Sequence, residues 1–146
     1  MSDSQTATNQ PTTEKEGIYT FSKGIPGFHE ITEYMVVQQI TPFSLLQSAL
    51  HPETSFIMID PFVYYPDYEF ELPQEVVDEL AITKEEHVVI RNIVSWNKKA
   101  EHRTVNLVAP IIFNIDNHQA KQIILQNTQY TIRHPLQPNV AKGGES

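Results

Sequence analysis

Short runs of β-branched and aromatic residues, separated at close intervals by turn residues, constrain the fold of this chain more than any other feature. The runs predicted to be strands are 18–21, 33–40, 55–59, 68–72, 88–96, 104–108, 111–115, 120–126 and 130–133. One helix is predicted over 72–80, with Pro73 at a first helical position and three apolar residues on one face. Segments 97–102 and 116–119 are predicted hairpin loops. The pattern indicates an all-β, mainly antiparallel fold, either a small β-barrel-like domain or a sandwich with one short helix.

The polar ends of the chain set the domain boundaries. Residues 1–17 contain no large apolar side chain after Met1, so they have nothing to bury that would offset the entropy of being ordered. We expect a disordered tail there and a second flexible tail over 137–146. The body between them, 18–136, has the length of a single domain.

The absence of cysteine excludes disulfides, thiol catalysis and cysteine-ligated metals, and it is compatible with a reducing compartment. No apolar run approaches the length needed to cross a membrane, and the first 30 residues have no signal-peptide pattern. We therefore expect a cytoplasmic protein without a membrane partner.

The negative charge of the chain is concentrated in one region. Ten carboxylates and no lysine or arginine lie between Lys23 and Lys84, so this segment carries −10 while the whole chain carries −8. Such a surface repels nucleic acid and attracts a basic protein. The alternative interpretation is a solvated face that keeps a small protein soluble.

Within the acidic region, the run 67–72 alternates strictly between acidic and apolar residues. In a strand, Asp67, Glu69 and Glu71 would line one face, with neighbouring side chains about 7 Å apart. Two interpretations stay open, and they are compatible: a charged edge that prevents aggregation, or a row that binds basic side chains.

Gly24 and Gly27 are the only glycines between residues 18 and 136. Pro26 followed by Gly27 is typical of the central positions of a type II turn, in which the second residue needs a positive φ. We expect a structural turn at this point. A phosphate-binding loop is excluded because no Lys-Ser/Thr pair opens a helix after the glycines.

An enzyme is disfavoured. The six histidines are scattered singly, without the spacing of a metal site, and no activated nucleophile accompanies Asp60. No catalytic residue, metal or cofactor is therefore predicted. A ligand- or peptide-binding β module is the alternative function, and it would use exposed aromatic residues. The candidates are Tyr64, Tyr65, Tyr68 and Trp96.

Five sequence segments, in order, resemble the flagellar assembly factor FliW family. The segments are Phe-Ser-Lys-Gly-Ile-Pro-Gly-Phe at 21–28, Pro-Phe-Ser-Leu-Leu-Gln-Ser at 42–48, Phe-Ile-Met-Ile-Asp-Pro at 56–61, Asn-Leu-Val-Ala-Pro at 106–110 and Tyr-Thr-Ile-Arg-His-Pro-Leu at 130–136. The resemblance covers nearly all of the predicted body and leaves out the N-terminal tail.

The resemblance implies a non-catalytic, cytoplasmic, chaperone-like protein with a small β-barrel-like fold, monomeric when free. It implies binding to the translational repressor CsrA, a basic RNA-binding dimer, which releases the block on flagellin mRNA. It also implies binding to flagellin, which competes with CsrA, and an allosteric antagonism away from the RNA-contacting surface. For the partner site we predict Asp67, Glu69 and Glu71, together with a second region at Asn106, Ile111 and Phe113.

Overall fold

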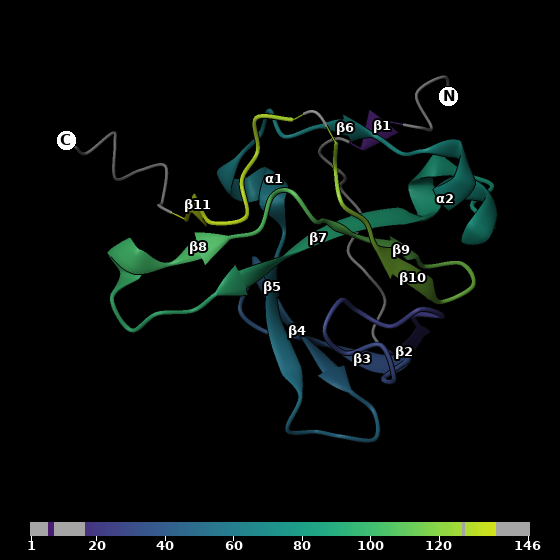
Figure 1. Cartoon of the computed structure of the whole chain (residues 1–146), viewed down its shortest axis with the longest axis horizontal. Helices are drawn as coiled ribbons and strands as arrows, with labels where there is room; N and C mark the ends of the chain where they lie inside the picture. Colours follow the sequence, from purple (N-terminus) through teal and green to yellow (C-terminus); the bar gives the residue numbers. More distant parts are fainter. Residues whose placement is uncertain (1–5, 8–16, 127, 137–146) are drawn as a thin grey trace.

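The computed structural model describes residues 6–7, 17–126 and 128–136, and its central element is a closed seven-stranded β-barrel (Figure 1). Its strands are, in spatial order, β7 (Val88–Ser95), β5 (Ser55–Ile59), β4 (Phe43–Ser48), β3 (Glu33–Gln38), β2 (Gly17–Thr20), β10 (Gln119–Gln122) and β9 (Ile111–Asn114). The pairing of β9 with β7 closes the barrel. This architecture confirms the predicted all-β, mainly antiparallel class.

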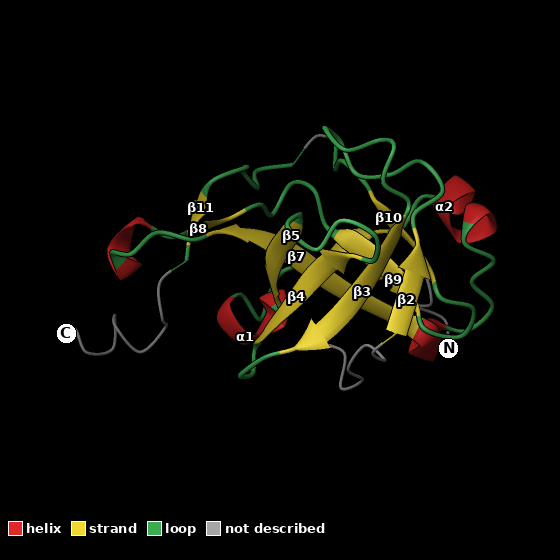
Figure 2. Ribbon diagram, turned by 90° about the horizontal axis from the view of Figure 1, so that it is seen from below, coloured by secondary structure: helices red, strands yellow, loops and turns green. Residues whose placement is uncertain are grey.

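The remaining elements extend or cover the barrel (Figure 2). They are β8 (Thr104–Val105) beside β7, β11 (His134–Pro135) beside β8, the separate pair β1 (Thr6–Ala7) and β6 (Phe70–Glu71), the helices α1 (Pro61–Tyr64) and α2 (Gln74–Glu79), and the 3₁₀ turns η1 (Glu85–His87) and η2 (Ala100–His102). Every named strand pair is antiparallel except β2 with β10, which is parallel.

Two hydrophobic cores lie on the two sides of the barrel wall. The core inside the barrel includes Tyr19, Leu46, Met58 and Phe113. The Tyr19 and Phe113 rings pack edge to face, with a centroid distance of 5.0 Å. The second core lies outside, where α1, α2 and residues near 123 cover β7 and β9. Because both faces of β7 and β9 are covered, most of their residues are buried, including the polar Arg91, Asn92 and Asn114.

Strand β4 was not among the predicted strands, and its burial pattern gives the reason. Ser44, Leu46 and Ser48 are buried and alternate with half-buried Phe43, Leu45 and Gln47. Two of the three inward positions are therefore polar, so the usual alternation of apolar and polar residues does not appear. Because of these two buried serines, the sequence pattern did not indicate a strand at this position.

The helices and the last predicted strand also differ from expectation. Pro73 is the N-cap of α2 and not its first helical residue, although Val76, Val77 and Leu80 are buried as predicted. Helix α1 was missed: the Asp60 side chain caps it by accepting a hydrogen bond from the Phe62 amide at 3.1 Å. No strand forms at 130–133, and the chain pairs with β8 only at β11.

The predicted N-terminal tail is partly ordered. Thr6–Ala7 pairs antiparallel with Phe70–Glu71, and Gly17 pairs with Val36 in the barrel. Within the segment 1–17 that we predicted to be a disordered tail, the structure therefore describes Thr6–Ala7 and Gly17 as strand residues. Residues 1–5, 8–16 and 137–146 lie outside the described part of the chain. Among the described residues, no helix has the length and apolar character needed to span a membrane.

Candidate partner-binding surface

The acidic row keeps the predicted alternation of faces. Asp67, Glu69 and Glu71 are exposed, whereas Tyr68 and Leu72 are only 2% and 4% exposed. Only Phe70–Glu71 of this run is a regular strand, so the predicted strand over 68–72 is shorter than expected. The outward orientation comes from burial of Tyr68 and Leu72 in the second core.

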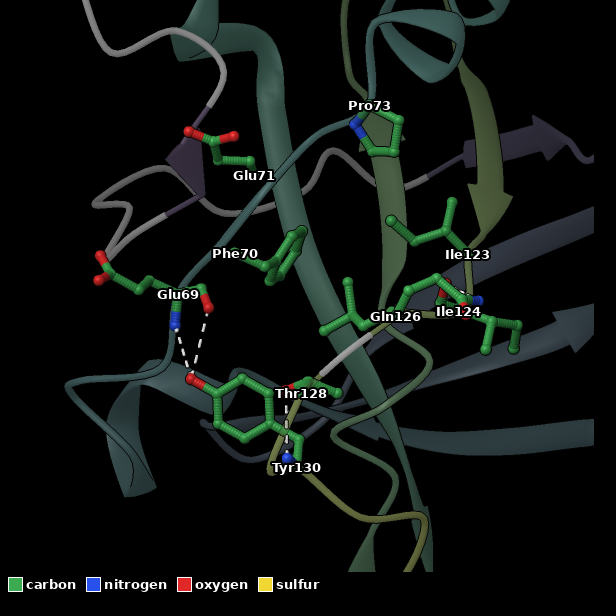
Figure 3. Close-up of a pocket in the computed structure, with 10 residues that line it drawn as sticks. Glu69, Phe70, Glu71, Pro73, Ile123, Ile124, Gln126, Thr128 and Tyr130 are labelled. Carbon is green, nitrogen blue, oxygen red and sulfur yellow. Dashed lines mark hydrogen bonds between the residues drawn. The ribbon is translucent and has the colours of Figure 1, made fainter.

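A groove of about 400 Å³ runs beside the acidic row (Figure 3). One wall comes from residues 69–71 and Pro73, and the other comes from residues 123–126. In Figure 3 the Phe70 ring lies on the side of Ile124, whereas the Glu69 and Glu71 carboxylates lie on the opposite side of the strand. The groove therefore has an apolar interior and an acidic outer rim.

Tyr130 holds the strand that carries the rim. Its hydroxyl accepts a hydrogen bond from the Glu69 amide at 3.2 Å and donates one to the Glu69 carbonyl at 3.3 Å. Its ring packs on the Tyr68 ring with a centroid distance of 4.8 Å. These contacts fix the main chain at the middle of the acidic row, so the carboxylates are presented on a rigid backbone.

Tyr68 anchors the same segment from inside. Its hydroxyl donates to the Leu107 carbonyl at 2.7 Å and accepts from the Asn92 side-chain amide at 3.2 Å. Burial is the main cause that raises the pKa of Tyr68 above its ordinary value, so this hydroxyl stays protonated and remains a donor.

The second predicted region is structural, and the prediction for it is corrected. Ile111 and Phe113 are fully buried inside the barrel and present no side-chain surface to a partner. The Asn106 side-chain oxygen accepts hydrogen bonds from the Val108 and Ala109 amides, both at 3.1 Å, and so shapes its own loop. Sequence reasoning missed that both faces of β9 are covered.

The glycine segment forms a tight turn over Ile25–Phe28. The Phe28 amide donates to the Ile25 carbonyl at 2.6 Å, and Gly27 has a φ of 89° at the third position, which is the geometry of a type II turn. Gly24 also has a positive φ, 67°, and a side-chain carbon there would lie 2.6 Å from the His29 Cα. Both glycines are therefore required by the backbone.

The aromatic residues of the alternative β-module function do not form one surface. Tyr64, Tyr65 and Tyr68 border a hollow of about 330 Å³, whereas Trp96 follows β7 and lies against Phe43 of β4. The Tyr65 hydroxyl donates to the Pro135 carbonyl, and burial raises the pKa of Tyr65 to about 12. Within the described residues, no cluster of three or more histidine or acidic side chains is arranged to hold a metal.

The opposite wall of the groove was missed from the sequence. Ile124 is 54% exposed and faces a wall formed by residues more than 50 positions earlier in the chain. No local pattern reports such a long-range juxtaposition.

Comparison with known proteins finds one family. A family model described as FliW protein matches residues 3–136, so the match begins within the N-terminal segment that the resemblance left out. A flagellar assembly factor FliW of Caldanaerobacter subterraneus subsp. tengcongensis is 41% identical over 125 residues, which cover 84% of this chain and 83% of that protein. The Bacillus subtilis (strain 168) protein with the same name is 36% identical over 135 residues, covering 91% and 90%.

A solved structure is similar as well. The crystal structure of a flagellar assembly factor FliW superimposes with a TM-score of 0.80 at 36% identity, over 92% of this chain and 98% of that chain. The similarity therefore extends over the whole barrel and the elements that cover it.

Proposed function

This chain belongs to the FliW family of flagellar assembly factors, and on that premise we propose that it binds the translational repressor CsrA and relieves repression of flagellin mRNA. It acts in the cytoplasm, and it also binds flagellin. Flagellin and CsrA exchange on this protein, so the level of free flagellin controls flagellin synthesis. No catalytic step is involved.

The acidic rim is the observation that supports CsrA as a partner. A repressor that binds RNA needs lysine and arginine to displace phosphate counterions, so it presents a positive surface. Three exposed carboxylates on a fixed backbone, Asp67, Glu69 and Glu71, offer the complementary charge.

The apolar interior of the groove supplies the second requirement of a docking site. Charge at a rim mainly increases the association rate, whereas desolvated apolar contacts slow dissociation. Phe70 and Ile124 provide such contacts between the two walls. The groove therefore fits a segment with apolar side chains flanked by lysine or arginine.

A binding competition with purified components tests the proposed function. CsrA is first bound to a labelled leader of flagellin mRNA, and this protein is then added while RNA binding is followed by fluorescence anisotropy. We expect the bound fraction of RNA to fall as the protein is added, and to recover when flagellin is added afterwards. Unchanged RNA binding together with no detectable CsrA complex would contradict the proposal.

A further inference from the structure

A second hollow, of about 230 Å³, lies on the outer surface of the barrel and shares no residue with the acidic groove. Its lining residues are Gln39, Ile40, Phe43, Leu45, Ile57 and Trp96. Five of these six side chains are apolar, and two of them are unusually open: Ile40 is 84% exposed and Trp96 is 49% exposed. A connected apolar surface of this kind on a soluble protein marks an interaction site.

Trp96 is held in a defined orientation. The edge of its ring system meets the Phe43 ring at a centroid distance of 5.7 Å and an angle of 84°. The Arg103 guanidinium lies 3.6 Å above the indole, and the Arg103 Nε donates to the Asn97 carbonyl at 2.8 Å. The indole is therefore a fixed part of the surface, since it is held by a ring on one side and a cation on the other.

The loop that follows Trp96 is basic, and its Arg103 lies over the Trp96 ring that lines the hollow. Lys98 and Lys99 are exposed and lie two and three positions after Trp96 in the loop that returns to Arg103, and Glu101 is the only carboxylate of that loop. Within the part of the chain that the structure describes, no ion pair links any of these three cations to a carboxylate. We call the lining residues together with Lys98, Lys99 and Arg103 the apolar–basic patch.

The backbone around the patch excludes docking by strand addition. Among the described residues, β4 pairs with β3 and β5, and β5 pairs with β4 and β7, so both edges are occupied at the lining strand residues Phe43, Leu45 and Ile57. An incoming segment must satisfy its own main-chain hydrogen bonds and contact the patch through side chains alone. An α-helix meets this requirement.

We propose that the apolar–basic patch docks an amphipathic α-helix of a protein partner, with apolar side chains on one face and carboxylates along the edge of that face. Its charge preference is opposite to that of the acidic groove, so the two surfaces select different segments. The inference does not depend on the proposed function, because it rests on other residues.

Trp96 is the only tryptophan in the chain, so its fluorescence reports on this patch alone. The probes are two synthetic amphipathic peptides of roughly 18 residues, since shorter isolated helices are marginally stable. They share one leucine face and contain no aromatic residue. They differ only in flanking residues, which are glutamate in one peptide and lysine in the other.

The glutamate peptide is expected to shift the Trp96 emission to shorter wavelength and to bind at least about tenfold more tightly than the lysine peptide. Ile40→Glu places a charge on the exposed apolar surface. It is expected to lower the affinity for the glutamate peptide by at least about tenfold. Arg103→Glu is expected to reduce the preference for the glutamate peptide, because it removes one of the three cations and adds a carboxylate. Leu50→Glu is the matched control, because Leu50 is 79% exposed and lies outside the patch.

Equal binding of the two peptides, or an Ile40→Glu variant that binds as the wild type does, would overturn the proposal. Self-association that Ile40→Glu abolishes, with no response to the glutamate peptide, would identify a second copy as the occupant and would also overturn it. The double variant Glu69→Lys, Glu71→Lys should bind the glutamate peptide normally, which separates this test from that of the acidic groove.

Discussion

The Tyr68 hydroxyl lies 2.7 Å from the main-chain carbonyl oxygen of Leu107, to which it donates a hydrogen bond. This contact joins the acidic row to the loop after β8. The Asn92 side-chain amide of β7 donates a second hydrogen bond to the same hydroxyl. The exposed carboxylates are thus presented on a segment whose alternate residues are bound into the second core.

Removing the hydroxyl tests this anchoring. Tyr68→Phe leaves the buried Leu107 carbonyl without this donor, so the free energy of unfolding should fall by about 1–2 kcal/mol. Urea denaturation measures the change. Tyr64→Phe is the control, because Tyr64 is half-buried and no hydrogen bond of its hydroxyl is seen among the described residues; its effect should stay within about 0.5 kcal/mol. Equal stability of the two variants would show that the hydroxyl is not an anchor.

The two glycines of the 24–27 segment should differ in their tolerance of alanine. At Gly27 nothing lies within 4 Å of an added Cβ, so only the positive φ opposes it, at a cost of about 1–2 kcal/mol. At Gly24 the added atom would also meet the main chain of residues 28 and 29 at 2.6–2.7 Å. Thermal unfolding should therefore rank Gly24→Ala as the less stable variant. The opposite ranking would show that the turn is not positioned as described.

A surface ion pair gives the stability a pH dependence of known sign. The hydrogen bond from Lys121 to Glu79, 2.7 Å long, is the main cause that lowers the pKa of Glu79 below its ordinary 4.5. The folded state therefore favours the charged carboxylate, so this contribution is present above the unfolded pKa and is lost as the pH falls through the lowered value. Glu79→Gln should be less stable than the wild type at pH 7, and the two should converge in acid. A constant difference at all pH values would contradict the pairing.

The N-terminal strand should contribute little to stability. Thr6–Ala7 forms a two-residue ladder with β6, and each hydrogen bond adds only about 0.5–1.5 kcal/mol. Deleting residues 1–16 should therefore lower the free energy of unfolding by no more than about 1–2 kcal/mol and change CsrA affinity by less than tenfold, or about 1.4 kcal/mol. A larger loss of affinity, measured by isothermal titration calorimetry, would place the N-terminal segment in the interface.

Local patterns in the sequence predicted the features that depend on neighbours in the chain. The alternation around Tyr68, the apolar face of α2 and the turn at Gly27 each follow from spacing or from a backbone requirement that a few residues express. The sequence motifs at 21–28 and 130–136 also led to the family, which the comparisons confirm.

Features that depend on distant parts of the chain were not predicted. Ser44 and Ser48 point into the barrel, so β4 lacked the usual pattern, and Phe113 belongs to a strand covered on both faces by two separate cores. The groove itself joins Glu69 to Ile124, and no periodicity connects those positions. Packing between segments that are distant in the sequence creates these relationships, so the pattern of a single segment does not predict them.

The affinity of the double variant Glu69→Lys, Glu71→Lys for purified CsrA tests the central claim most directly. Both side chains are exposed, so folding should be retained. Glu53→Lys with Glu86→Lys is the control, because it makes the same change in net charge at exposed positions outside the groove.

Surface plasmon resonance at several salt concentrations gives both the affinity and the association rate. We predict at least about tenfold weaker binding for the groove variant than for the control, mostly through slower association. We also predict that the association rate of the wild type falls steeply as salt rises, because screening weakens long-range attraction. A groove variant that binds CsrA as tightly as the control, with the salt dependence of the wild type, would show that the acidic row only protects a strand edge.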